Sequence, residues 1–387
     1  EQFNRNAGFS SRINFSNNGV FFPSTTNSSA LELNTTFSNK TSNNLIIGYT
    51  SVNDDRGSLG ENFPFVLIDD VNNGSIRFET EEFSTGNFLS QKILTITDNF
   101  KIYNGKHTWT IGTHNEFYDI KNVFIRQNYG SYDFDNIDAF INGDGAADYD
   151  RSYSLVDNIT GDGTSAAAEF KAMQLGLYAQ DEIQINSKFT LTAGLRLDIP
   201  IITDDPKIAS TFNSTTLSAI KPFYDIADQV EGGKAPQGQL MFSPRVGFQY
   251  DMKDDRTTIL RGGAGVFTSR VPFVWPGGMF NNNGLTVGSV DERDLGGRGN
   301  VPFIADINNQ YTNPNFTTPS GQIDIFTDDF KYPQVFRMNL GFDKQFANGW
   351  ETTLEGIFTK TLNNVNYTNI NSNPTADFTW TGGPDDR

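Results

Sequence analysis

Apolar and polar residues alternate with a period of two through the stretch from Lys171 to Asp198. In its first half Leu175, Leu177 and Ala179 point to one side, and the polar or small residues between them point to the other. After a turn at 186–188 the alternation resumes, which predicts two antiparallel strands in a hairpin. Each strand is long enough to cross a bilayer at a tilt of about 45°, which takes roughly 9 to 11 residues. One apolar and one polar face at that length predict transmembrane β-strands.

The same alternation recurs along the whole chain and predicts an all-β fold of about eleven long strands. Short turns and long connections follow one another in strict order. In bacterial barrels the short turns lie on the periplasmic side and the long loops lie outside the cell, so this asymmetry favours an antiparallel up-and-down transmembrane β-barrel. Strands of period two alone also fit a sandwich or a propeller. Besides the central hairpin, the predicted strands lie at about 7–15, 31–37, 45–50, 88–101, 107–118, 242–251, 257–269, 336–343 and 350–358.

The long connections are rich in glycine and in polar and acidic residues, and we expect them to be extracellular loops. One short strand is expected in the first of them, at Ser75–Thr80. The expected loops cover about 54–87, 119–165, 201–239 and 270–331.

Composition and charge exclude several classes of partner and site. The chain of 387 residues carries 46 acidic against 29 basic side chains and has a net charge of −17, so nucleic acid is not expected as a partner. The absence of cysteine excludes a disulfide framework and a thiolate metal site. The sequence has no apolar run of the length that a transmembrane helix needs. A mean hydropathy of −0.44 still fits a barrel, because only alternate strand residues face lipid.

Four stretches in the strands carry a family resemblance: NGKHTWTIGTHNEFY at 104–118, GLYAQDEIQINSKFTLTAGLRLD at 176–198, FSPRVGFQYD with TTILRGGAGVF at 242–267, and FRMNLGFDKQFANGWETTLEGIFTK at 336–360. They resemble the barrel of TonB-dependent outer-membrane receptors, in particular the Oar-like branch that carries a carboxypeptidase-regulatory domain. The resemblance implies a plugged barrel of about 22 strands in the outer membrane of a Gram-negative bacterium. Such a barrel imports a scarce or bulky ligand with energy that TonB delivers.

About eleven strands make half of such a barrel, and an open sheet edge in lipid costs several kcal/mol per unpaired backbone group. We recognise no plug, TonB box or C-terminal closing strand in the sequence. We therefore expect residues 1–387 to form a partial barrel, with outer-membrane lipid around it and the remaining strands, the plug and the contact with TonB supplied by other segments of a larger receptor. Two alternatives stay open: a surface barrel that adheres and transports nothing, and a soluble all-β binding module.

Several arginines fall on the polar side of the predicted strands, where acidic residues such as Asp198, Asp343 and Glu355 also lie. We expect them to face the lumen, either as a substrate path or as contacts to a plug or, as ordinary polar lumens favour, as a solvated wall with internal ion pairs. Aromatic residues near the predicted turns are expected to form a girdle at the lipid headgroups, with ordinary packing against a neighbouring chain as the alternative. The lumen-facing arginines are Arg196, Arg245, Arg261 and Arg337, and the girdle residues are Trp109, Phe189, Phe248, Tyr250 and Trp350.

An acidic stretch, NGDGAADYD, places several oxygen ligands in one connection, as calcium requires. It lacks the EF-hand spacing, so a solvated acidic loop fits the same residues. No other cofactor is expected. The candidate calcium ligands are Asn142, Asp144, Asp148 and Asp150.

The longest connection contains an aromatic cluster beside a proline and two glycines. Such side chains can grip a peptide or a sugar ring, or they can pack the connection onto its neighbours. The ligand classes that suit these loops are oligosaccharide, peptide and chelated metal. The candidate ligand-binding residues are Phe273, Trp275, Met279 and Phe280.

No arrangement of residues predicts catalysis. The two histidines, His107 and His114, are seven positions apart on one strand, so they should face opposite sides and cannot share a metal. No serine-nucleophile, zinc-protease or phosphate-binding-loop motif is found. We therefore do not expect an enzyme.

Overall fold

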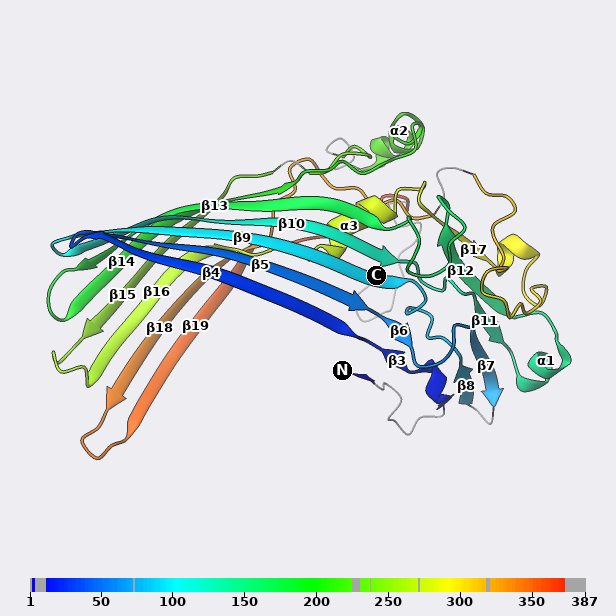
Figure 1. Ribbon diagram of the computed structural model, residues 1–387, viewed down its shortest axis with the longest axis horizontal. Coiled ribbons are helices and arrows are strands. Elements are labelled where there is room, and N and C mark those ends of the chain that lie inside the picture. The colour runs from blue at the N-terminus through cyan, green and yellow to red at the C-terminus, as the bar shows by residue number, and fades with distance from the viewer. Residues whose placement is uncertain are drawn as a thin grey trace, which may run out of the picture.

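A computed structural model of the protein describes residues 2–3, 12–71, 74–224, 230–236, 238–270, 272–317 and 321–372. Its main feature is a curved antiparallel sheet in which each strand pairs with its neighbour in the chain, in the order β19-β18-β16-β15-β14-β13-β10-β9-β5-β4 (Figure 1). The all-β, up-and-down fold predicted from the alternation is confirmed, with an open edge at β4 and at β19. The ten strands are β4 Ser24–Ser38, β5 Thr41–Asp55, β9 Asn87–Asn104, β10 His107–Phe124, β13 Ala168–Gln184, β14 Phe189–Ile202, β15 Met241–Asp251, β16 Thr258–Thr268, β18 Gln334–Gln345 and β19 Glu351–Asn363.

The sheet holds ten of the about eleven strands that the sequence predicts. The first predicted strand, at 7–15, is not part of it. Of that segment, residues 12–14 form β2 (Arg12–Asn14), which belongs to a second sheet, and residues 7–11 lie outside the described residues.

One face of the long sheet is apolar and exposed. Because residues paired across an antiparallel ladder share a face, the pairing of Leu195 with Pro244 and of Ala193 with Val246 places these side chains together. Patches of this size on a soluble protein would be covered, whereas on a barrel they face lipid. No second sheet of the described chain covers this face: Leu177 is 59% exposed and Leu195 49%. Large exposed side chains on the apolar face include Leu31, Leu33, Ile47, Leu94, Trp109, Ile111, Phe117, Val246, Met338, Leu340, Phe342, Leu354 and Phe358.

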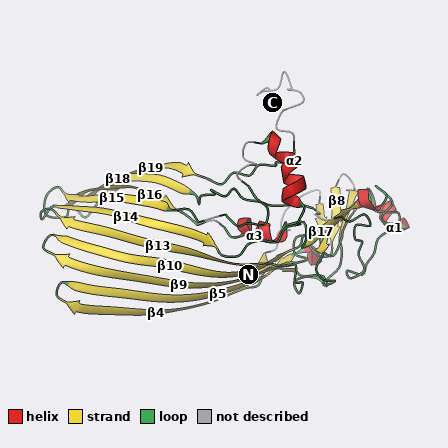
Figure 2. Ribbon diagram, turned by 90° about the horizontal axis from the view of Figure 1, so that it is seen from above, coloured by secondary structure: helices red, strands yellow, loops and turns green. Residues whose placement is uncertain are grey.

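The two ends of the long sheet differ. Short turns join β4 to β5, β9 to β10, β13 to β14, β15 to β16 and β18 to β19, and all five lie at one end (Figure 2). Gly105 in the second turn has a φ of 63°, a conformation that glycine adopts without strain. The expected girdle residues Trp109, Phe189, Phe248, Tyr250 and Trp350 lie at or near this end, and Phe189 packs against both Phe248 and Tyr250.

The long connections are folded rather than loose. Strands from three of them join β2 in a six-stranded sheet, in the order β17-β12-β11-β7-β8-β2, beyond the ends of the long strands (Figure 1). The expectation of plain loops at 54–87, 119–165 and 270–331 is therefore wrong in part, although the short strand expected near 75–80 is present as β8. The strands are β7 Phe65–Val71, β8 Gly74–Phe78, β11 Ser131–Phe134, β12 Asp148–Ser154 and β17 Val287–Asp291.

Short elements complete the described chain. Strands β1 (Gln2–Phe3), β3 (Val20–Phe21) and β6 (Gly57–Ser58) form a small sheet of their own. None of the described helices is long and apolar enough to span a membrane. The helices are α1 Ile137–Asn142, α2 Ser218–Ile220 and α3 Val274–Asn281, with helical turns at Ser16–Asn18, Phe212–Leu217, Lys221–Phe223 and Glu292–Leu295.

The six-stranded sheet has its own core. Tyr132 and Tyr149 are fully buried, their rings lie 4.7 Å apart, and both hydroxyls donate to Oε1 of Gln310, at 2.7 and 3.2 Å. Arg151 is only 7% exposed, and its guanidinium donates to the carbonyl oxygens of Asn128, Gln310 and Tyr311 at 2.8 to 3.0 Å. These bonds fasten the connection between β16 and β18 to strand β12.

Replacing Arg151 tests this fastening. Arg151→Met should lower the stability of the six-stranded sheet by about 2–4 kcal/mol, because three buried carbonyls lose a charged donor. Limited proteolysis of the protein in detergent should then cleave near 300–313 much faster than in the wild type. Arg293→Met is the control, since the Arg293 side chain is 80% exposed. Equal cleavage in both variants would contradict a fastening role for Arg151.

Candidate functional site

The four arginines expected in the lumen all lie on the face of the long sheet opposite the apolar one. Arg245 is paired across the ladder with Gly194 on β14 and Gly265 on β16, and Gly265 is paired with Arg337 on β18. Arg196 and Arg261 follow by alternation along β14 and β16. This face is therefore the polar wall of the barrel portion.

Most of these arginines are held by neighbours on the same wall. Arg196 binds Asp198 through Nε and Nη2 at 2.7 to 3.0 Å, and Arg261 binds Asp343 at 2.8 Å. Arg261 also reaches Glu355 on β19, at 3.3 Å. The Arg245 guanidinium lies 4.6 Å from the centre of the Phe267 ring. These internal contacts favour the solvated wall over a row of free guanidinium groups that attract substrate.

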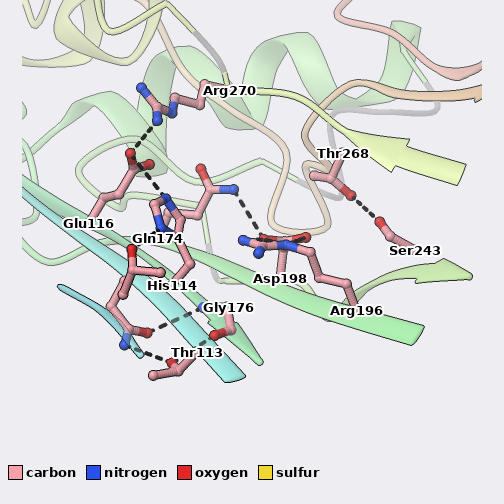
Figure 3. A network of polar contacts seen from close by, with 12 residues as sticks. Thr113, His114, Glu116, Gln174, Gly176, Arg196, Asp198, Ser243, Thr268 and Arg270 are labelled. Atoms are coloured by element: carbon pink, nitrogen blue, oxygen red, sulfur yellow. Dashed lines mark hydrogen bonds and ion pairs between the residues drawn. The ribbon is translucent and has the colours of Figure 1, made fainter. Parts of the chain in front are cut away.

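A polar network on this wall reaches the connection that follows β16 (Figure 3). The Glu116 side chain is 6% exposed; its carboxylate accepts from the Tyr118 hydroxyl at 2.7 Å and lies 3.5 Å from His114 Nε2. Arg270, the second residue after β16, forms an ion pair with the same carboxylate. His114 in turn bonds to Thr97 on β9 at 2.7 Å. The network ties the start of the longest connection to the inner wall.

The aromatic cluster expected to bind ligand lies in the same region. Phe273 packs on Tyr118 with ring centres 4.6 Å apart, and Phe280 stacks on Phe170 at 4.7 Å. Met279 is 2% exposed, and Trp275 packs against the small cluster of Met241 and Tyr332. Phe273 and Phe280 therefore place helix α3 on β10 and β13, and Trp275 packs toward β15. These contacts favour the packing interpretation of Phe273, Trp275, Met279 and Phe280.

A second candidate site is a pocket of about 210 Å³ on one face of the six-stranded sheet. Across the ladders Asp133 lies opposite Asp148, and Ser131 lies opposite Asp150, so the carboxylates gather on the face away from the tyrosine core. The pocket is lined by Phe65, Leu67, Arg77, Glu82, Gln127, Ser131, Asp133, Asp148, Tyr149 and Asp150.

The charges in this pocket are not balanced. Burial and then the charge of Asp148 raise the pKa of Asp133 to about 7, and burial also raises the pKa of Glu82. Only Arg77 opposes them among the lining residues. The pocket therefore repels anions and favours a neutral or cationic ligand.

The four candidate calcium ligands do not come together. Asp148 and Asp150 line the pocket, whereas Asn142 ends helix α1 and Asp144 lies exposed after it. Among the described residues no group of three or more acidic or histidine side chains is arranged to hold a metal ion. Calcium binding stays a prediction from sequence. The expectation that His107 and His114 face opposite sides agrees with the strand register.

Sequence reasoning did not single out Glu116, Arg270 or Asp133. Glu116 sits at a polar position of a predicted strand, which is a weak signal shared by many wall residues. Arg270 has no local signal, since its partner is 154 positions away. The sequence shows that the connection 119–165 around Asp133 is rich in acidic residues, but the strand pairing that buries Asp133 depends on tertiary structure.

The exposed apolar face, the polar wall and the folded connections at one end together define an outer-membrane β-barrel protein. A family model described as "Outer membrane beta barrel domain" matches residues 1–386, and the chain belongs to that family. Its location is accordingly the outer membrane of a Gram-negative bacterium. No curated protein matches the chain.

Solved structures similar to the chain include the outer membrane transporter YddB from Escherichia coli, at 11% identity with a TM-score of 0.47 over 87% of this chain and 33% of that one. The copper transporter OprC is 10% identical, with a TM-score of 0.49 over 89% of this chain and 40% of that chain. A mutant of the ferric enterobactin receptor PfeA from Pseudomonas aeruginosa is 13% identical, with a TM-score of 0.45 over 89% and 35%. The chain thus spans 33 to 40% of the length of these structures.

The ion pair between Glu116 and Arg270 can be tested with a double-mutant cycle. Arg270→Met removes the cation from the Glu116 carboxylate and should destabilise the docked connection by about 1–2 kcal/mol, because the Arg270 side chain is 57% exposed and solvent screens the pair. Glu116→Gln together with Arg270→Met should cost much less than the sum of the two single changes. Protease cleavage within 270–290, measured in detergent, reports the docking. Additive effects would contradict a direct pair.

The raised pKa of Asp133 predicts a pH dependence. Its ordinary value is 3.8 and its folded value about 7, so the folded state keeps the proton while the unfolded chain loses it. Stability of the six-stranded sheet should therefore fall as pH rises from about 4 to about 7, by at most about 4 kcal/mol at about 1.4 kcal/mol per pKa unit. Asp133→Asn should remove most of this fall and Asp144→Asn should not. Amide exchange of β11 and β12, corrected for intrinsic rates, measures it.

Proposed function

We propose that the chain forms part of the wall and the ligand-capturing extracellular unit of a TonB-dependent importing receptor. One observation carries the proposal: three of the long connections at one end of the sheet are built into a single folded unit with a pocket. Extracellular loops that only link strands do not need a buried core of their own. A folded unit above a polar wall suits capture followed by passage inward.

The connection between β16 and β18 joins the two parts of this scheme. It contributes β17 to the six-stranded sheet, and its beginning is fastened to the inner wall by Arg270 and Phe273. A ligand that moved β17 would therefore act on a segment that lies against the wall. This continuity offers a physical route from ligand capture in the six-stranded sheet to opening of a passage along the wall.

The open edges β4 and β19 require further strands in a bilayer, because unpaired backbone groups in hydrocarbon cost several kcal/mol each. In the proposed receptor these strands, the plug and the contact with TonB belong to other segments. The wall arginines, which are mostly paired internally, would present the passing ligand with a hydrated surface of nearly balanced charge.

The pocket narrows the ligand classes. Its carboxyl groups disfavour an acidic peptide or an anionic metal chelate, since either would add negative charge to a pocket where the charge of Asp148 already raises the pKa of Asp133. A neutral oligosaccharide, a basic peptide or a cationic chelate is compatible with the pocket.

Import can be tested with labelled probes of different charge. Cells that produce the full receptor should accumulate a labelled neutral oligosaccharide or basic peptide in the periplasm, and should exclude an acidic peptide of the same size. Accumulation should disappear when TonB is deleted. The variant Asp133→Asn with Glu82→Gln should reduce uptake about tenfold, as expected for the loss of roughly 1.4 kcal/mol of binding, and Asp144→Asn should leave it unchanged.

Probe binding at the cell surface with no accumulation, in the presence of TonB, would support the adhesive barrel instead. Accumulation that persists without TonB would contradict energised import. Recovery of the full protein in buffer without detergent would contradict the membrane assignment of this chain.

A further inference from the structure

On the lipid-facing side of β9, β10 and β13, a row of apolar side chains is followed by a row of charged side chains. Along β10 the outward residues from Trp109 to Phe117 carry no charge, and the last of them, Phe117, is paired with Leu94 and Met173. The next outward position, Asp119, is paired with Lys92 on one side and Lys171 on the other. A row of charge thus follows directly on the last apolar row.

The position of this row matches the outer boundary of the membrane. From His107 to Phe117 the strand rises about 34 Å at roughly 3.4 Å per residue. A tilt of about 45° reduces this to roughly 24 Å, close to the apolar band of outer-membrane barrels, which is about 25 Å tall. The charged row lies toward the long connections, which is the extracellular side. It is therefore at the level of the outer-leaflet headgroups.

The lysines of this row are available. Lys92 and Lys171 are both exposed, and neither forms a salt bridge with a residue in the described ranges. Their Cα atoms flank Asp119 at one strand spacing each, so they are about 10 Å apart. One row higher, Lys121 is already bound to Glu169 at 2.8 Å.

A hollow of about 230 Å³ opens at this patch and is lined by Ser90, Lys92, Asp119, Ile120, Lys121 and Glu169. Its lining offers ammonium donors together with carboxylate and hydroxyl acceptors. That combination suits a headgroup that carries phosphate and also has hydroxyl or amide donors. Leu94, Phe117 and Met173 lie directly below it, as a surface for acyl chains.

We propose that this patch binds the phosphorylated headgroup of an outer-leaflet lipid, with Lys92 and Lys171 as the phosphate-binding residues. A chain with a net charge of −17 repels anionic lipid overall, so two free lysines at this level are a local reversal of charge. Lysine stems can run along an apolar surface and present the ammonium group to a phosphate. Asp119, between them, accepts from hydroxyl or amide groups of the same headgroup. The binding is independent of the proposed import.

The test uses the full protein in detergent and vesicles of phosphatidylcholine that contain a bisphosphorylated glucosamine lipid. Lys92→Gln with Lys171→Gln should weaken vesicle binding about 10- to 30-fold, as expected for roughly 1 kcal/mol per lysine near a lipid surface. Binding by the wild type should weaken as salt is raised. The arginine pair Lys92→Arg with Lys171→Arg should retain binding.

The matched control is Lys40→Gln with Lys101→Gln, which removes the same charge from exposed lysines at the turn end of the sheet. Equal loss of binding in this control and in Lys92→Gln with Lys171→Gln would overturn the proposal. Undiminished binding to the same lipid after phosphatase treatment would overturn it too. Competition by millimolar inorganic phosphate alone would assign the patch to free phosphate and not to lipid.

Discussion

The constraint on which the structure depends is the pairing of backbone amides and carbonyls in hydrocarbon. A strand in lipid has no water to satisfy these groups, so each of the ten long strands must be hydrogen-bonded along its whole membrane length. The simplest way to meet this demand is to pair neighbours in the chain through short turns. That choice fixes the up-and-down order, sends every long connection to the other end, and forces each strand to show one face to lipid and one to water.

This local character explains what the sequence could predict. The period of two at Leu175, Leu177 and Leu195 follows from one strand face in lipid and the other in water. The hairpins were therefore predictable from a few residues each. The six-stranded sheet was not, because β12 pairs with β17, whose sequence lies far along the chain, and strands of four to seven residues carry little periodic signal. The same holds for Arg270, whose role depends on Glu116 rather than on its own neighbours. The aromatic cluster at 273–280 was visible, but whether it faces solvent or wall is decided by α3.

Charge is treated differently in the two parts of the molecule. On the wall, Arg196 binds a carboxylate two residues along its own strand and Arg261 binds one on the next strand, so that opposite charges neutralise within the sheet. In the six-stranded sheet Asp133 and Asp148 face each other with little compensation, and the result is a raised pKa rather than an ion pair. Balanced charge costs little in stability and binds little. Unbalanced charge lowers stability, and a fold that retains it has a place where a ligand of the right sign gains binding energy.

The segregation of charge along the barrel axis has a mechanical consequence. The lysines at 92 and 171 lie at the lipid boundary, and the acidic unit lies beyond it, on the side of the long connections. In a leaflet with anionic headgroups the first attracts and the second repels. The attraction of the lysines holds the wall at a fixed depth in the membrane. The repulsion of the acidic unit keeps the folded connections raised above the lipid surface. In the proposed receptor the pocket receives its ligand from the medium and needs this clearance, which a uniform net charge along the axis could not provide.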